Sequence, residues 1–106
     1  MKDIIDLTSV SPKINELLEN KAQQDHYKRY TILSYQLAGI GKSMRYSMIY
    51  PEQKKAHLEY LKTELSDLMI QTIVFAKLFN FNVNDLLQLG IERLDEFKLH
   101  GKYDES

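Results

Sequence analysis

The stretch LEYLKTELSDLMIQTIVFAKLF, residues 58–79, decides the fold class of this chain. Apolar side chains recur in it at steps of three and four residues, the spacing that lines up one face of an α-helix. Its second half is apolar on nearly every side, so this helix needs cover from more than one direction. The expected apolar stripe consists of Leu58, Leu61, Leu65, Leu68, Thr72, Phe75 and Phe79. The stretch predicts one long helix. Two carboxylates, Glu64 and Asp67, lie in the middle of it, although a buried helix would be expected to carry apolar side chains there.

The rest of the chain predicts further helices, because it holds only two prolines and four glycines among 106 residues and lacks hairpin dipeptides such as Asn-Gly. Gly39 and Gly41 are expected to be close-packing points between helices. We predict an all-α antiparallel bundle, with a flexible lead-in over residues 1–10 and a single domain over 11–106. We expect four helices. The first begins at Ser11-Pro12, the second covers about 27–48 and the third about 52–79. The fourth begins at Asn82 or Asn84 and ends at about residue 99.

Composition narrows the expected partners and compartment. The net charge is −1 and no cysteine is present, so disulfides and thiolate metal sites are excluded. No helix carries the basic reading face of a helix-turn-helix DNA binder, and no segment is apolar enough to span a bilayer. We therefore expect a cytoplasmic protein that binds neither nucleic acid nor membrane.

Glu64 and Asp67 lie about 60° apart on a helix surface, flanked by apolar side chains. Buried carboxylates without a partner are costly, and inside a helical bundle they commonly share a cation. The plainer alternative is a boundary pair that lies half in water or pairs with a lysine. A second Glu-x-x-Asp pair, Glu92 and Asp95, is read most simply as part of a solvated helix face.

Residues 60–87, YLKTELSDLMIQTIVFAKLFNFNVNDLL, resemble the second half of the MazG-like nucleoside triphosphate pyrophosphohydrolases. Members of that all-α family bind Mg²⁺ through a Glu-x-x-Glu pair on one helix and a Glu-x-x-Asp pair on the next. They cleave nucleoside triphosphates to the monophosphate and pyrophosphate. The resemblance implies a MazG-like bundle of about four helices, with Glu64 and Asp67 as catalytic residues and ligands of Mg²⁺, or alternatively Mn²⁺.

The first family motif aligns with YQLAGIGK, residues 35–42, and here the chain departs from the pattern. The alignment places Gln36 and Gly39 at the two glutamate positions, and neither residue carries a carboxylate. Gln36 and Lys42 are the residues expected to contact the substrate, a (d)NTP. With half of the metal ligands missing, we expect slow or undetectable hydrolysis. The alternative is a non-catalytic helical homo-oligomer that binds nucleotide or a protein partner.

Self-association is expected from the third helix. Met69, Ile70 and Ile73 lie off its main stripe, and a chain this short cannot cover them all internally. We therefore predict a homodimer or homotetramer.

Overall fold

The computed structural model describes residues 11–99, with side chains up to residue 96. Every regular element in this range is helical, and this confirms the predicted all-α class. The expected lead-in, residues 1–10, lies outside the described residues. The elements are α1 (Ser11–Leu18), a 3-10 turn (Lys21–Gln24), α2 (His26–Ile49), a second 3-10 turn (Pro51–Gln53), α3 (Lys54–Leu78) and α4 (Val83–Leu99).

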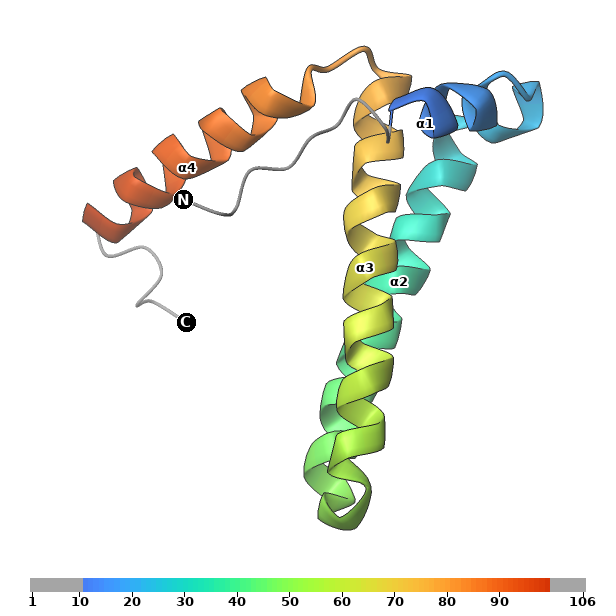
Figure 1. Ribbon diagram of the computed structural model, residues 1–106. Helices are drawn as coiled ribbons and strands as arrows, with labels where there is room; N and C mark the ends of the chain where they lie inside the picture. The colour runs from blue at the N-terminus through green and yellow to red at the C-terminus, as the bar shows by residue number, and fades with distance from the viewer. Residues whose placement is uncertain (1–10, 100–106) are drawn as a thin grey trace.

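The two longest helices, α2 and α3, lie side by side and antiparallel, forming a hairpin that dominates the molecule (Figure 1). The turn between them forms at Tyr50-Pro51, because proline forces the residue before it out of the helical region. Asp25 caps the start of α2, where its side chain accepts a 2.7 Å hydrogen bond from the Lys28 amide. The predicted boundaries of both helices are correct to within two residues.

The junction of α3 and α4 is formed by two asparagines. Asn80 has a φ of 60°, which lets Phe81 N–H donate back to the Ala76 carbonyl at 3.0 Å, the six-to-one bond of a Schellman motif. Asn82 then caps α4, accepting a 3.0 Å hydrogen bond from the Asp85 amide. Of the two predicted caps, Asn82 and Asn84, the structure therefore selects Asn82.

The residues at which α2 and α3 face each other form what we call the inner seam. Along both helices its positions alternate at steps of four and three residues, as in a coiled coil. All of them are buried or half-buried. They are Arg29, Leu33, Gln36, Ile40, Ser43 and Ser47 of α2, and His57, Leu61, Glu64, Leu68, Gln71, Phe75 and Leu78 of α3.

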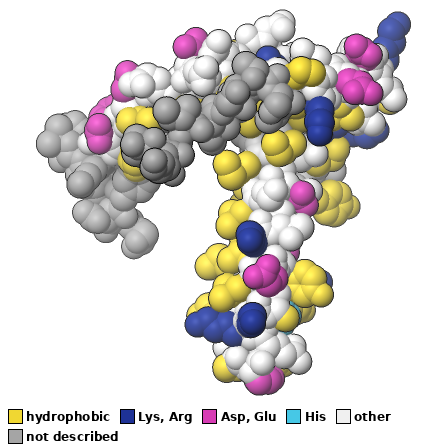
Figure 2. Space-filling model, in the orientation of Figure 1, with side chains coloured by type: hydrophobic (Ala, Val, Ile, Leu, Met, Phe, Trp, Pro, Cys, Tyr) yellow, Lys and Arg dark blue, Asp and Glu magenta, His cyan; other side chains and the backbone are white. Residues whose placement is uncertain are grey.

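The inner seam corrects the apolar stripe expected for α3. Leu61, Leu68 and Phe75 lie in the seam as expected, whereas Leu58, Leu65 and Phe79 are 43%, 45% and 39% exposed. Thr72, the remaining residue of the expected stripe, is exposed as well. The helix is rotated because polar residues, Glu64 among them, take positions that hydrophobic patterning alone assigns to leucines. A row of apolar side chains is consequently left on the outside of the hairpin, and Figure 2 shows hydrophobic side chains at its surface.

The helices α1 and α4 do not close a bundle around the hairpin. Helix α1 lies across one end, where Ile14, Val74 and Ala76 form the fully buried apolar core. Helix α4 extends away from α3 (Figure 1) and exposes five apolar side chains between Leu86 and Leu94. The Cα radius of gyration, 16.6 Å, exceeds the about 13 Å of a compact chain of this length. Among residues 11–99, no helix combines the length and apolarity that spanning a bilayer requires.

Candidate functional site

Glu64, the first predicted site residue, lies at the middle of the inner seam and faces α2. Its carboxylate accepts a hydrogen bond from the Ser43 hydroxyl through Oε1. Ser43 is only 5% exposed, and Glu64 is half-buried. A hydroxyl that donates to a carboxylate makes a charge-assisted bond, stronger than a neutral one. The carboxylate is therefore stabilised by the helix pair itself.

Gly39 makes this position of Glu64 possible. A Cβ atom at residue 39 would overlap Glu64 Oε2 and lie 3.0 Å from its Cδ. A glycine inside a helix costs about 1 kcal/mol of stability relative to alanine, and here the close approach of a charged side chain gives the glycine a structural reason. The expectation that Gly39 is a close-packing point is confirmed. Gly41 differs, because outside its own turn of helix no atom of residues 11–96 lies within 4 Å of the position its Cβ would take.

Asp67, the second predicted carboxylate, is exposed and does not share the environment of Glu64. It lies one heptad after Tyr60, so the two residues share a face of α3. Of the two carboxylates expected to bind Mg²⁺ together, only Glu64 therefore faces α2. The 60° between the two positions places Glu64 in the seam and turns Asp67 to its solvent edge.

The two residues expected to contact substrate lie on α2, near this edge of the hairpin. Gln36 is half-buried in the inner seam, seven residues before Ser43. Lys42 is exposed, and its Nζ lies 5.7 Å from the centroid of the Tyr46 ring. A cation over the face of an aromatic ring is attracted to it, which orients the lysine without neutralising its charge.

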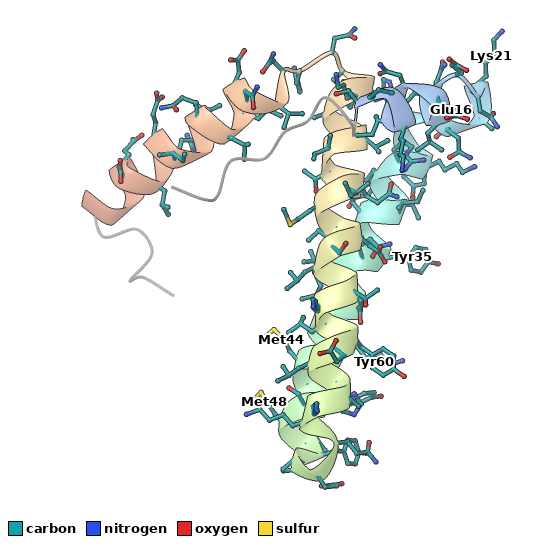
Figure 3. All side chains as sticks on the ribbon, in the orientation of Figure 1. Glu16, Lys21, Tyr35, Met44, Met48 and Tyr60 are labelled. Atoms are coloured by element: carbon teal, nitrogen blue, oxygen red, sulfur yellow. The ribbon has the colours of Figure 1, made fainter. Side chains whose placement is uncertain are left out.

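Tyrosines mark the side of the hairpin on which these residues gather. Tyr35 and Tyr60 point to one side, and Met44 and Met48 to the other (Figure 3). Because residues seven apart share a helix face, Lys42 lies on the side of Tyr35. We call this side the polar face, and it is defined by Tyr35, Lys42, Tyr60 and Asp67. A phosphate would meet Lys42 there, and 74% exposed Tyr35 and 63% exposed Tyr60 offer rings on which a base could stack.

The donor set of this region does not fit a resident Mg²⁺. Within residues 11–99, no three Asp, Glu or His side chains come close enough to hold a metal ion. Glu64 Oε1 accepts a hydrogen bond from the Ser43 hydroxyl, and Gly39 has no side chain that could coordinate an ion. The second Glu-x-x-Asp pair, Glu92 and Asp95, is exposed on α4, which extends away from the hairpin (Figure 1). An ion would need most of its oxygen ligands from elsewhere.

A second polar layer, around Arg29, was not anticipated. Arg29 is 3% exposed, and its guanidinium donates through Nη1 to Gln23 Oε1 at 2.7 Å and through Nη2 to Gln71 Oε1. Its Nε has no partner among the described residues, and both acceptors are neutral. Burial lowers the pKa of Arg29 from its ordinary value. Among the described residues, the layer is a buried cation whose hydrogen-bond acceptors are side-chain amides.

Spacing is the signal that could have revealed these layers. The polar seam residues recur every seven positions, as Arg29, Gln36 and Ser43 in α2 and as His57, Glu64 and Gln71 in α3. His57 is a further polar residue of the seam. Its ring packs near those of Tyr46, Tyr50 and Tyr60, with centroid distances of 5.6, 6.5 and 6.3 Å. A seven-residue repeat of polar residues inside two apolar helices is typical of paired, polar seam positions.

Comparison with known proteins adds no relative. No protein-family model matches the chain, and neither the curated proteins nor the solved structures give a significant match.

Proposed function

We propose that this protein is a MazG-like helical homo-oligomer that binds a nucleotide on its polar face and hydrolyses it slowly or not at all. The observation that carries the proposal is the contact of Glu64 with Gly39, locked by the hydrogen bond from Ser43. The resemblance pairs these helices in this register, with Gln36 and Gly39 opposite Glu64. The position of Glu64 on Gly39 supports that alignment, which was made from sequence patterns alone.

The same contact argues against efficient hydrolysis. A triphosphate carries a high negative charge, and breaking it develops more charge on the leaving pyrophosphate. The MazG-like enzymes meet this with four carboxylates that hold cations. Here a glycine takes one of the four positions and a glutamine another, and a serine hydroxyl holds Glu64. We infer that the hydrogen bond replaces the metal as the partner of this carboxylate.

The second candidate function is Mg²⁺-dependent hydrolysis of a (d)NTP to the (d)NMP and pyrophosphate. It is favoured by the retention of both carboxylates of the second motif, Glu64 and Asp67, near one edge of the hairpin. An ion would have to arrive with the nucleotide phosphates, since Mg²⁺ accepts one or two protein carboxylates together with phosphate oxygens.

Two measurements separate these candidates. Nucleotide binding is followed by calorimetry across the common (d)NTPs, and pyrophosphate release is measured with millimolar Mg²⁺ or Mn²⁺. We expect binding that Lys42→Ala weakens about tenfold, through loss of one charged phosphate contact. The matched control, Lys62→Ala, removes an exposed lysine of α3 that lies off the polar face and should leave binding unchanged.

Pyrophosphate release should be very slow or undetectable. Brisk turnover that Glu64→Ala abolishes would establish the second candidate, and Glu92 and Asp95 would be the first places to seek the missing ligands. If no nucleotide binds, the proposal is wrong in its central claim.

A further inference from the structure

The exposed side of α2 carries a second coiled-coil pattern that α3 does not use. Its residues recur at steps of three and four, as the residues of the inner seam do. We call them the outer seam, and all of them are exposed. They are Tyr27, Tyr30, Ser34, Leu37, Gly41, Met44 and Met48. Met44 and Met48 point away from the side of Tyr35 and Tyr60 (Figure 3), so the outer seam lies on the side of the hairpin opposite the polar face.

Exposure along the outer seam is large and involves apolar side chains. Leu37 is 64% exposed, Met44 51% and Met48 76%. Over the 22 residues from Tyr27 to Met48, no outer-seam position carries a charge. A solvated helix face would carry charged side chains there. An uncharged heptad seam is instead the pattern of a helix that packs on another helix.

Gly41 supports the same reading independently. It lies inside α2, where glycine weakens a helix, and beyond its own turn of helix no atom of the described residues lies within 4 Å of the position of its Cβ. Gly39 is explained by its contact with Glu64, whereas no such contact is found for Gly41 in the described part of the chain. A glycine at the centre of an uncharged seam allows another helix to approach closely.

We propose that the outer seam packs antiparallel against the outer seam of a second copy, about a two-fold axis at Leu37. This interface rests on the self-association in the proposed function. It adds which face of the hairpin forms the contact and the relative direction of the two α2 helices. The sizes of the side chains are symmetric about Leu37, with small residues, Ser34 and Gly41, on either side of it and large ones beyond. Antiparallel packing sets Ser34 against Gly41 of the second copy, and Tyr30 against Met44. Methionine sulfur makes favourable contacts with aromatic rings, and antiparallel helices oppose their dipoles.

The area available fits a dimer of this kind. The outer seam is about 32 Å long at 1.5 Å per residue. Leu58 and Leu65 of α3 extend the apolar surface beside it, because each lies two residues, or about 200°, from Tyr60 and Asp67 of the polar face. With a hairpin roughly 20 Å wide, the face offers about 600 Å² per chain, or about 1,200 Å² in a dimer, within the range of specific interfaces. Helix α4 extends from the hairpin on the side to which Met44 and Met48 point, which is the side of the outer seam (Figures 1 and 3).

Engineered cysteines test the direction of packing cleanly, because the chain has no native cysteine. Under mild oxidation, Leu37→Cys should form a covalent dimer with itself. Tyr35→Cys, its matched control, is two residues away and 74% exposed on the polar face, and should remain monomeric on a denaturing gel. A mixture of Tyr30→Cys and Met44→Cys should cross-link to each other and not to themselves. The reverse pattern, with self-linked Tyr30→Cys, would overturn antiparallel packing.

Light scattering with Leu37→Lys and Tyr35→Lys gives the second measurement. Both side chains are exposed within one chain, so circular dichroism should show both variants helical. Leu37→Lys should raise the dimer dissociation constant at least roughly 100-fold, because the two-fold axis brings two lysines together. Tyr35→Lys should leave it unchanged. A wild-type monomer at micromolar concentration would overturn both the interface and the self-association of the proposed function. A dimer that Leu37→Lys leaves intact would overturn the interface alone.

Discussion

The hydrogen bond between Ser43 and Glu64 predicts a measurable loss of stability on Ser43→Ala. Hydrogen bonds to charged groups contribute about 1.5–3 kcal/mol. Because Glu64 is half-buried and its carboxylate can turn partly to water, the lower end applies, and we expect a loss of about 1–2 kcal/mol in the free energy of unfolding. For a chain of this length, that lowers the melting temperature by roughly 5–9 °C.

The assay is urea denaturation followed by circular dichroism, at one fixed protein concentration because self-association makes the midpoint concentration-dependent. Ser66→Ala is the matched control, since Ser66 is exposed on α3. It measures the gain of up to about 0.5 kcal/mol that alanine brings to any helix. The difference between the two variants isolates the hydrogen bond of Ser43.

A double-mutant cycle with Glu64→Gln sharpens the test. Glutamine can still accept from Ser43, but as a neutral partner, so Ser43→Ala should cost about half as much in that background. If Ser43→Ala and Ser66→Ala agree within about 0.3 kcal/mol, the Ser43 hydroxyl does not stabilise the carboxylate, and the explanation offered for weak hydrolysis loses its support.

Three further predictions follow from the same contacts. Gln71→Glu gives buried Arg29 a carboxylate in place of a neutral amide acceptor and should stabilise the fold by about 1–2 kcal/mol in urea denaturation. Because Arg29 would hold the pKa of the new carboxyl below its ordinary value of about 4.3, the gain should be present above that pH and disappear as the pH falls; a gain that persists at pH 2 would contradict this reasoning. Asn82→Ala should cost about 1 kcal/mol of α4 stability by loss of its cap, seen as faster amide exchange in the first turn of α4, while Asn84→Ala should cost much less; equal effects would show that Asn82 is not the cap. Asn80→Gly should be neutral or stabilising and Asn80→Val destabilising by about 1 kcal/mol or more in thermal melts, because a φ of 60° disfavours a β-branched residue; a Val variant as stable as the wild type would exclude the left-handed conformation in solution.

The sequence by itself determined the helical class and the helix boundaries. Apolar residues at steps of three and four, the Tyr50-Pro51 break and the asparagines after Phe79 are local signals, and helices depend mostly on local hydrogen bonds. The sequence also singled out Glu64, as a carboxylate in an otherwise apolar stretch, and Gly39, as a close-packing point between helices, and these two residues are in contact.

Only the tertiary structure decided how α3 is rotated about its own axis. Apolar counting assigned Leu58 and Leu65 to the buried stripe, yet Glu64 and Gln71 take the seam because hydrogen bonds from Ser43 and Arg29 satisfy them there. Such pairing joins residues 21 and 42 positions apart. The seven-residue spacing marks the polar positions along each helix, but it does not determine which of them pair across the seam. That rotation separates Glu64 from Asp67, and leaves a row of apolar side chains outside the hairpin for another surface to bury.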